Sequence, residues 1–389
     1  MDRARSARSS PPQRRTPTTA GSPPTRNPKT QDALARDAFA KLLSTAKPAV
    51  EKEMLAMFAE RRKQREGQGR EVKSIIDTGE SLSLRGGKRF RAALLFAGYY
   101  GVQPNGAIGV AVLGGVALEM LQSYLLIQDD WMDGDVERRG GPSAHVFLAK
   151  ALGKGPLPAE HAGAVGALLT SDLVWGLAVD ALLRAKVDAA LAVRALAELV
   201  RIHEDVVAGQ VLDTLAKKPD VEVLHDLKTG SYTVRGPLAL GATLGGASNK
   251  ILKSLAGYAN PLGVAFQLRD DLLGVFGTEQ EAGRPQGSDL LAGKSTAVVR
   301  HADARLRGAA KQAVARVWKN REASRADMAQ AVDAIAQTGA REAVEKRLAE
   351  LCETAESAAR KLPLSEKARL ELTGASLAIR VGPGGREAR

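Results

Sequence analysis

The chain has 389 residues, a formal net charge of +12 and a single cysteine, Cys352. Residues 1–31 carry seven Lys or Arg against one Asp, so half of the net charge lies there and the remainder of the chain is only mildly basic. This distribution argues against a nucleic-acid partner, and one cysteine excludes an internal disulfide.

Residues 1–31 are rich in Arg, Ser, Thr and Pro and show no apolar periodicity. We predict a disordered basic tail, because such a composition cannot bury enough apolar surface to offset the entropy of ordering. Its prolines disfavour the amphipathic helix of a transit peptide, and it has no apolar stretch like that of a secretory signal. The expected location is therefore the reducing cytoplasm.

Residues 32–380 are rich in Ala, Leu, Arg and Glu, a composition that favours helix, and no period-two alternation indicates a strand. In chain order, helices are predicted over residues 32–65, 89–100, 107–133, 158–185, 190–216, 221–245, 250–276 and 295–317, with several more between 324 and 380. Pro261 is a candidate kink. The expected fold class is all-α, one large helical bundle over 32–380 followed by a flexible tail at 381–389.

The helix predicted over 107–133 is apolar enough to be mistaken for a membrane span, because residues 107–127 carry only Glu119 as a charge. Gly114, Gly115 and Gln122 within it, and the aspartates that follow, favour a buried helix of a soluble bundle instead. We expect no stable membrane insertion.

Asp129 and Asp133 are four residues apart and so share one face at the end of that helix. Carboxylates there oppose the negative end of the helix dipole, a conflict that a cation would relieve. Mg²⁺ typically takes one or two protein carboxylates together with substrate phosphate oxygens. The spacing is therefore compatible with a magnesium site, although a solvated helix end would show the same residues.

A second pair, Asp270 and Asp271, also ends an apolar helix, and a loop rich in Gly, Pro and charge follows each pair, at 134–145 and 277–294. Basic residues gather nearby: Arg138 and Arg139, Lys294, and the run 86–91 with Lys88, Arg89 and Arg91. Lys and Arg bind phosphate oxygens directly, and glycines allow close backbone approach. Together these features predict a site for two diphosphates, one bound through metal and one through Lys and Arg.

The motifs resemble those of the trans-type polyprenyl synthetases, the isoprenyl diphosphate synthase family, over roughly residues 35–375. They are the segments 86–91 (GGKRFR), 129–133 (DDWMD) with 138–145 (RRGGPSAH), 209–213 (GQVLD), 228–232 (KTGSY), 266–274 (FQLRDDLLG) and 287–296 (GSDLLAGKST). The resemblance implies an isoprenoid-synthase bundle with a central active-site cavity. It also implies a homodimer.

The resemblance further implies roles for individual residues. Three magnesium ions would be held by Asp129, Asp133 and Asp270, supported by Asp130 and Asp271. The allylic diphosphate would be held by Arg138, Lys228, Gln267 and Lys294, and isopentenyl diphosphate by Lys88, Arg91, Gln122 and Arg139. Thr229 and Gln267 would lie near the allylic cation that forms when diphosphate departs and that the double bond of isopentenyl diphosphate attacks.

Three positions depart from the family pattern. Gly274 stands in place of a third Asp in the second motif, Arg284 where Lys is frequent, and Gln122 where His is frequent. A metal bound mainly through Asp270 could survive the first change, and the other two keep a charge or a hydrogen-bonding side chain.

Product length is expected to depend on residues behind the first motif, Tyr124, Leu125 and Leu121. An aromatic residue five positions before Asp129 resembles the short-chain enzymes, and the prediction is geranylgeranyl diphosphate, with farnesyl diphosphate as the alternative. A terpene cyclase would need no second diphosphate site. A non-catalytic partner subunit is an alternative of a different class, although it would usually lack the carboxylates kept here.

Overall fold

The computed structural model describes residues 28–217, 220, 223–224, 226–282, 285–320, 322–381 and 385. Most of the predicted tails, and Arg284, lie outside the described residues. The helices are α1 (Pro28–Gln64), α2 (Arg70–Leu84), α3 (Phe90–Val102), α4 (Ile108–Met132), α5 (Ala144–Leu152), α6 (Ala159–Leu183), α7 (Ala189–Leu215), the π-helix η1 (Asp226–Arg235), α9 (Gly236–Leu244), α10 (Asn249–Phe276), α11 (Glu279–Ala282), α12 (Ser288–Leu291), α13 (Ala297–Asp303), α14 (Gly308–Val317), α15 (Arg325–Ala336), α16 (Ala340–Lys361) and α17 (Glu366–Ile379).

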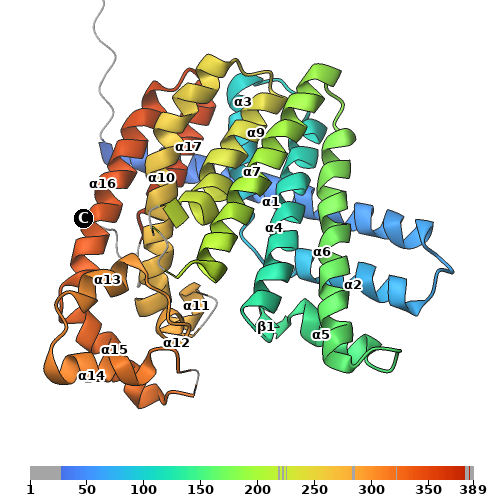
Figure 1. The fold of residues 1–389 in the computed structure, drawn as a ribbon. Coiled ribbons are helices and arrows are strands. Elements are labelled where there is room, and N and C mark those ends of the chain that lie inside the picture. The colour runs from blue at the N-terminus through green and yellow to red at the C-terminus, as the bar shows by residue number, and fades with distance from the viewer. Residues whose placement is uncertain are drawn as a thin grey trace, which may run out of the picture.

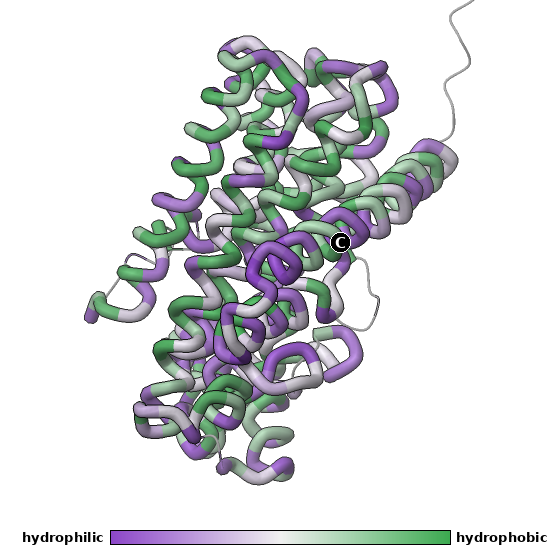
Figure 2. Tube along the Cα trace, turned by 90° about the vertical axis from the view of Figure 1, so that its right-hand side faces the viewer, coloured by the Kyte–Doolittle hydropathy of each residue, from purple (hydrophilic) through white to green (hydrophobic). Residues whose placement is uncertain are grey.

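The fold is all-α, as predicted: the strands in the described residues are β1 (Glu137–Arg138) and β2 (Gly141–Pro142), which pair as a short antiparallel hairpin. Figure 1 shows the long helices α4, α6, α7 and α10 running in roughly the same direction, with α1 crossing behind them. Figure 2 shows hydrophobic (green) and hydrophilic (purple) stretches alternating along the helices, as expected when one face is buried and another faces water.

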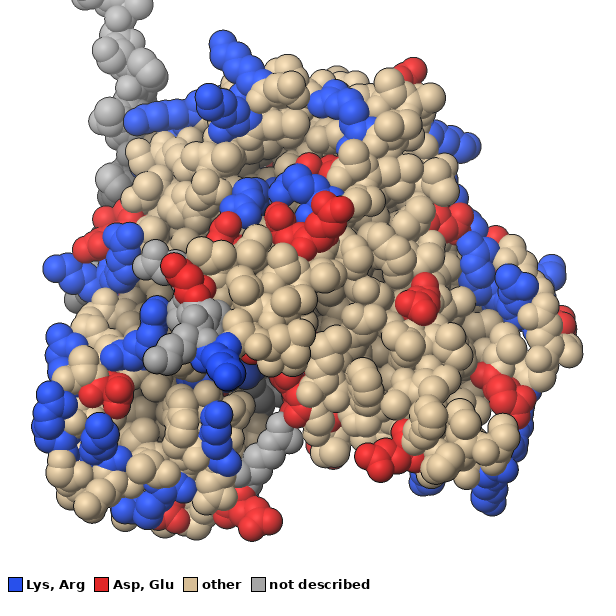
Figure 3. All heavy atoms as spheres, in the orientation of Figure 1, with Lys and Arg blue, Asp and Glu red and all other residues tan. Residues whose placement is uncertain are grey.

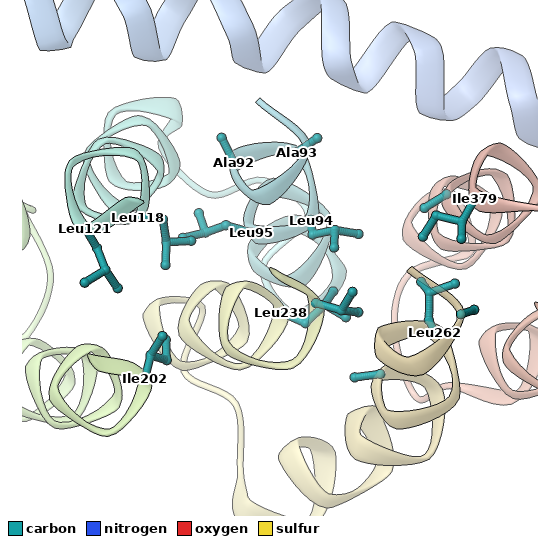
Figure 4. Packing of buried hydrophobic residues seen from close by; sticks show 14 of the residues in the cluster. Ala92, Ala93, Leu94, Leu95, Leu118, Leu121, Ile202, Leu238, Leu262 and Ile379 are labelled. Carbon is teal, nitrogen blue, oxygen red and sulfur yellow. The ribbon is translucent and has the colours of Figure 1, made fainter. Parts of the chain in front are cut away.

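Helix α3 lies at the centre of the bundle, in contact with α1, α4, α9 and α17. Every residue from Ala92 to Ala97 is fully withdrawn from solvent, and Figure 4 shows Leu94 and Leu95 among the surrounding helices. A Cβ atom at Gly241 of α9 would lie 2.1 Å from the carbonyl oxygen of Leu95, so the backbones of α3 and α9 touch only because this residue is glycine.

Several predicted boundaries differ from the structure. Helix α1 begins at Pro28, and α2 and α5 were not predicted; in α2 the buried residues include only one large apolar side chain, Ile76. The segment 221–245 contains η1 and α9, and 295–317 divides into α13 and α14, whose first residue, Gly308, has a φ of +51°. Pro261 lies inside α10, which continues through it to Phe276.

Helices α4 and α6 are both long and apolar enough to cross a membrane, judged by length and composition alone. In the fold, however, 67% of the most apolar 18-residue window of α4 and 50% of that of α6 are buried, and the two helices pack against each other. The core position predicted for the 107–133 helix is therefore the one observed.

Candidate active site

Two cavities meet at the C-terminal end of α4. The larger, about 1190 Å³, is lined by many charged residues, among apolar ones, from the segment before α3, the end of α4, the β1–β2 hairpin and the region of α11 and α12. The smaller, about 370 Å³, is lined mostly by apolar residues of α4 and α7 and reaches Lys228 and Tyr232 of η1. Leu126 and Asp129 line both cavities, so a molecule with a charged head and an apolar tail could occupy them together.

The carboxylates of the first motif point in two directions. Asp129 and Asp133 line the polar cavity, as their shared helix face predicts, whereas Asp130 is buried and accepts a hydrogen bond from Arg138 Nε at 2.7 Å. Burial and the neighbouring charge of Asp129 raise the pKa of Asp133. Burial also raises the pKa of Asp130, against the opposing effect of Arg138. Ionised carboxylates at this helix end are therefore unfavourable without a cation.

Lys228 joins the π-helix to the end of α4. Its Nζ lies 3.3 Å from Asp129 Oδ1 and 2.5 Å from Asp213 Oδ2, while Gln210 Nε2 donates to the same Asp129 oxygen at 3.1 Å. Burial disfavours the charge on Lys228, but the two aspartates outweigh burial and raise its pKa. This close approach requires glycine at Gly209 on α7, where a Cβ would lie 2.7 Å from the Lys228 backbone nitrogen.

In the second pair, as in the first, one aspartate is buried and the other is not. Asp270 is exposed on α10, whereas Asp271 is buried and accepts hydrogen bonds from Gln267 Nε2 at 2.7 Å and from the Ala297 backbone N–H at 2.8 Å. Burial raises the pKa of Asp271 to about 6. Asp271 thus ties α10 to the start of α13, and the exposed carboxylate of the pair is that of Asp270. Gly274, one turn after Asp270, is buried.

The β1–β2 hairpin presents the predicted arginine pair. Arg139 and Gly140 form its two-residue turn, both with positive φ, at 51° and 73°. Arg138 turns to Asp130, while Arg139 Nη1 donates to the Arg85 carbonyl oxygen at 2.9 Å. Burial, with the nearby charges of Arg89 and Arg91, lowers the pKa of Arg139.

Not every predicted residue lines these cavities. Those that do are Lys88, Gln122, Leu125, Asp129, Asp133, Arg138, Arg139, Lys228 and Lys294. Arg91 instead donates to Gln122 Oε1 and Thr233 Oγ1, both at 2.9 Å, with its guanidinium 4.1 Å from the centre of the Tyr232 ring. Thr229, Gln267 and Asp270 also lie outside the cavity linings.

Arg89 is a residue whose position sequence reasoning did not anticipate. It adopts a left-handed conformation with φ of 54°, and its side chain is 2% exposed. It donates to Glu51 of α1, Glu119 of α4 and the Ser83 carbonyl oxygen of α2, at 2.8–2.9 Å. This network explains the single charge inside the apolar stretch of α4, and it fixes the segment on which Lys88 and Arg91 stand.

Of the three residues expected behind the first motif, only Leu125 lines the apolar cavity. Leu121 is fully buried, and Figure 4 shows it between α4 and α7, where Ile202 also lies. The ring of Tyr124 contacts His203 of α7 and Trp175 of α6, with centroid distances of 5.3 and 5.8 Å. His203 and Trp175 were not predicted, and no sequence pattern connects them to Tyr124.

Whether magnesium fits this site depends on the side chains that could act as its ligands. Within the described residues, no group of three or more carboxylate, imidazole or thiolate side chains converges to hold a metal ion. Asp129 and Asp133 nevertheless supply hard oxygen donors at the rim of a polar cavity, and Mg²⁺ usually completes its shell with water and phosphate oxygens. The residues therefore fit an ion that binds together with a diphosphate.

Comparison with known proteins shows that the chain is similar to polyprenyl synthetases in sequence and in fold. The family model described as polyprenyl synthetase matches residues 72–335. The chain is 30% identical over 233 residues to a short chain isoprenyl diphosphate synthase of Methanocaldococcus jannaschii, covering 59% of this chain and 66% of that one. It is 34% identical over 220 residues to a (2E,6E)-farnesyl diphosphate synthase of Mycobacterium tuberculosis, covering 54% and 55%. The matched part thus spans less than two thirds of each relative's length.

Among solved structures, the fold resembles a geranylgeranyl pyrophosphate synthase from Corynebacterium glutamicum that was crystallised with isoprenyl diphosphate and magnesium. The TM-score is 0.73 at 27% sequence identity, and the match covers 90% of this chain and 98% of that one.

Proposed function

Since this chain belongs to the polyprenyl synthetase family, we propose that it is a prenyltransferase that joins isopentenyl diphosphate to an allylic diphosphate. The observation that carries the proposal is the pair of cavities meeting at Asp129, one polar and rimmed by both signs of charge, the other apolar. A prenyl diphosphate has the same division into a charged head and a hydrocarbon tail.

The residues that bind diphosphate divide between the two substrates. Arg138, Lys228, Gln267 and Lys294 hold the allylic diphosphate, and Lys88, Arg91, Gln122 and Arg139 hold isopentenyl diphosphate. Lys228 and Arg138 are already oriented by the aspartates of α4, so little reorganisation is needed when the allylic diphosphate binds. Arg91 must leave Gln122 and Thr233 to reach a diphosphate.

Magnesium, three ions by the family resemblance, is held by Asp129, Asp133 and Asp270, with Asp130 and Asp271 keeping the two helix ends in place. When bound, it neutralises the diphosphate and favours its departure. The basic residues retain the leaving diphosphate, which can accept the proton released after carbon–carbon bond formation. Thr229 and Gln267 stabilise the allylic cation, and the apolar residues of α4 and α7 exclude water from it.

The product proposed is geranylgeranyl diphosphate, with farnesyl diphosphate as the alternative. The similar proteins carry both names, so the similarity supports the reaction more strongly than the length. A non-catalytic partner subunit is disfavoured because both aspartate pairs and the basic residues are retained at the cavities.

We also propose that the protein is a cytoplasmic homodimer that does not insert into membranes. Exposed apolar side chains outside the cavity linings occur on α7 (Val193 and Val200) and on α6 (Leu168, Leu169 and Leu183). Figure 3 shows a broad, mostly uncharged area over the middle and right of the face drawn, where these helices lie in Figure 1. An apolar face of this kind suits contact with a second copy.

The deciding experiment incubates the purified full chain with labelled isopentenyl diphosphate, each allylic primer in turn and Mg²⁺, followed by chain-length analysis of the dephosphorylated products. We expect a C20 alcohol that disappears with a chelator. A C15 product would support the proposed reaction but show that the proposed chain length is wrong. No condensation with any primer by folded protein would refute the catalytic proposal and favour the partner-subunit alternative.

A further inference from the structure

The positive charge of the chain is concentrated in two segments. One is the tail, residues 1–31, and the other is residues 294–325, which carry nine Lys or Arg against Asp303 and Glu322. All other residues together hold 40 Lys or Arg against 41 Asp or Glu. In the fold, residues 294–325 contain α13, α14 and the first residue of α15, so the second concentration of charge lies on one small helical region.

Most cations of this region point into solvent without a carboxylate partner. Arg316 is paired with Asp327 at 3.1 Å, whereas Arg305 and Arg307 donate to backbone carbonyl oxygens. Figure 3 shows Lys and Arg gathered at the lower left of the face drawn, where α13, α14 and α15 lie in Figure 1, with a few acidic side chains among them. Five exposed residues of the region form no ion pair with any described residue, and we call them the basic face: Arg305, Arg307, Lys311, Lys319 and Arg325.

The basic face adjoins the polar cavity. The Lys319 backbone N–H donates to the Leu290 carbonyl oxygen at 3.0 Å, and a Cβ atom at Gly293 would collide with the Lys319 side chain. Leu291 and Lys294, on either side of this contact, line the cavity. Figure 1 shows α12 to α15 at the same end of the molecule as the β1–β2 hairpin and α5. The basic face is therefore continuous with the rim of the cavity.

Exposed apolar side chains lie at the same end of the molecule, on the side of α4 and α5. Trp131 is 49% exposed near the end of α4, and Phe147 of α5 and Leu157 of the following loop are also exposed. None of these three lines a cavity described above. Aromatic and aliphatic side chains in such positions suit the interface between lipid headgroups and hydrocarbon.

We propose that this end of the molecule binds peripherally to an anionic lipid surface. The basic face lies against the headgroups, Trp131, Phe147 and Leu157 enter the interface, and no helix crosses the bilayer. The rim of the polar cavity then lies at the lipid surface. If the protein makes a prenyl diphosphate, as proposed above, the hydrocarbon tail of the product passes into lipid rather than into water. The binding itself does not depend on that reaction.

Lipid fits these features better than nucleic acid does. Trp318 is the one Phe, Tyr or Trp in the sequence 294–325, and it is half-buried and packs against the hydrophobic core. Proteins that bind single-stranded nucleic acid along a basic groove usually also present aromatic rings on which bases stack. The exposed apolar side chains near the end of α4 and on α5 have no counterpart in a phosphate backbone, whereas a bilayer accommodates both kinds of side chain.

The size of the effect follows from the number of cations removed. One Lys or Arg near an anionic lipid surface raises the binding constant by a factor of about five. Replacing three residues of the basic face should therefore weaken binding on the order of 100-fold. Because the attraction is screened over a Debye length of about 8 Å at physiological ionic strength, added salt should weaken it as well.

The test sediments the purified full chain with vesicles of phosphatidylcholine and anionic phosphatidylglycerol, and with vesicles of phosphatidylcholine alone, in the absence of substrates. The test variant combines Arg305→Gln, Lys311→Gln and Arg325→Gln, which keep polar side chains at exposed positions. Thermal unfolding midpoints show whether it is folded. If the triple variant does not fold, Lys311→Gln alone carries the test, with an expected loss of about fivefold.

The matched control removes the same charge elsewhere. It combines Lys47→Gln on α1 with Lys250→Gln and Lys253→Gln at the start of α10, all at exposed lysines that form no ion pair with a described residue. Both triple variants keep the tail 1–31 and have the same net charge. A difference between them therefore reports where the cations lie.

Binding to the anionic vesicles that the test variant loses and the control keeps would support the proposal. Equal binding by the two triple variants, or no sedimentation of the wild type with anionic vesicles at low salt, would overturn it. Tighter binding to a single-stranded RNA than to the vesicles, lost in the same variant, would overturn it in favour of nucleic acid. Vesicle binding is measured without substrates, so a failure of the proposed reaction would leave this result unaffected.

Discussion

Arg89 Nη1 lies 2.9 Å from Glu119 Oε2 in an ion pair whose side chains are only 2% and 3% exposed. The pair joins the segment before α3 to the middle of α4, and Glu51 of α1 extends it. A charge buried this deeply is tolerated because its donors and acceptors are satisfied from three directions. The network therefore couples the stability of the bundle to the placement of the basic residues beside the polar cavity.

Removing one partner of this pair should be costly. Glu119→Leu leaves the Arg89 guanidinium buried and partly unpaired, and we expect the free energy of unfolding to fall by about 3–5 kcal/mol. Lys73→Met, which breaks the solvent-exposed pair with Asp77, should change it by less than about 1 kcal/mol. Urea unfolding of both variants measures the difference. Equal losses in the free energy of unfolding would show that the buried pair stabilises the fold no more than the exposed pair does.

Lys228 should matter to catalysis more than to folding. Lys228→Ala removes a positioned cation from the junction of the two cavities, and we expect kcat to fall on the order of 100-fold. Lys228→Arg should recover part of the loss, because it keeps the charge in a bulkier form. Steady-state kinetics with Lys250→Ala, an exposed lysine on α10, as the control would test this. A wild-type kcat in Lys228→Ala would contradict the role.

Replacing Asp133 should change stability and activity in opposite directions. Its pKa is raised and it caps the C-terminal end of α4, so Asp133→Asn should stabilise the metal-free protein by up to about 1 kcal/mol. The same change should lower activity in Mg²⁺ on the order of 100-fold, because a proposed metal ligand is lost. Thermal unfolding in chelator and assays in Mg²⁺ measure the two effects, and a loss of stability would argue against an unfavourable carboxylate here.

Glu371 of α17 predicts a pH dependence of stability far from the cavities. Burial raises the pKa of Glu371 to about 7, and its Oε2 is buried without a hydrogen-bond partner in the described residues. As the pH rises from about 4.5 to about 7, the unfolded chain loses this proton while the folded protein retains it, so stability falls through that window.

Glu371→Gln should remove this dependence. Above about pH 7 the variant should be more stable than the wild type by at most about 3 kcal/mol, and the two should converge near pH 4.5. Denaturant unfolding at several pH values gives the comparison. A pH-independent difference between the two proteins would show that the carboxylate titrates normally.

The helical class and the core position of α4 follow from local patterns, because apolar periodicity and motif spacing are properties of short segments. Asp129 and Asp133 share the predicted face for this reason. The π-helical form of 226–235 does not follow from such patterns, since the close contacts at Gly209 and Gly263 come from α7 and α10, remote in sequence.

The directions in which long side chains point also could not be predicted from the sequence. Lys88, Arg89 and Arg91 look alike in the chain, yet Lys88 is exposed at the cavity, Arg89 is buried in the bundle and Arg91 stacks on Tyr232. Their orientation depends on Glu51, Glu119 and Thr233, which belong to three other elements. Trp175 and His203 were missed because their meeting with Tyr124 exists only in three dimensions.

The β1–β2 hairpin has a consequence for insertions and deletions. Arg138 and Arg139 are chemically identical neighbours, but one faces Asp130 and the other the Arg85 carbonyl oxygen. Because Arg138 ends β1 and Arg139 begins the turn, one residue gained or lost before Arg138 would bring a different side chain to Asp130. Changes in the length of this short segment should therefore be tolerated far less than changes in its composition, a constraint that homologous sequences could reveal as a fixed spacing between the aspartates and the arginine pair.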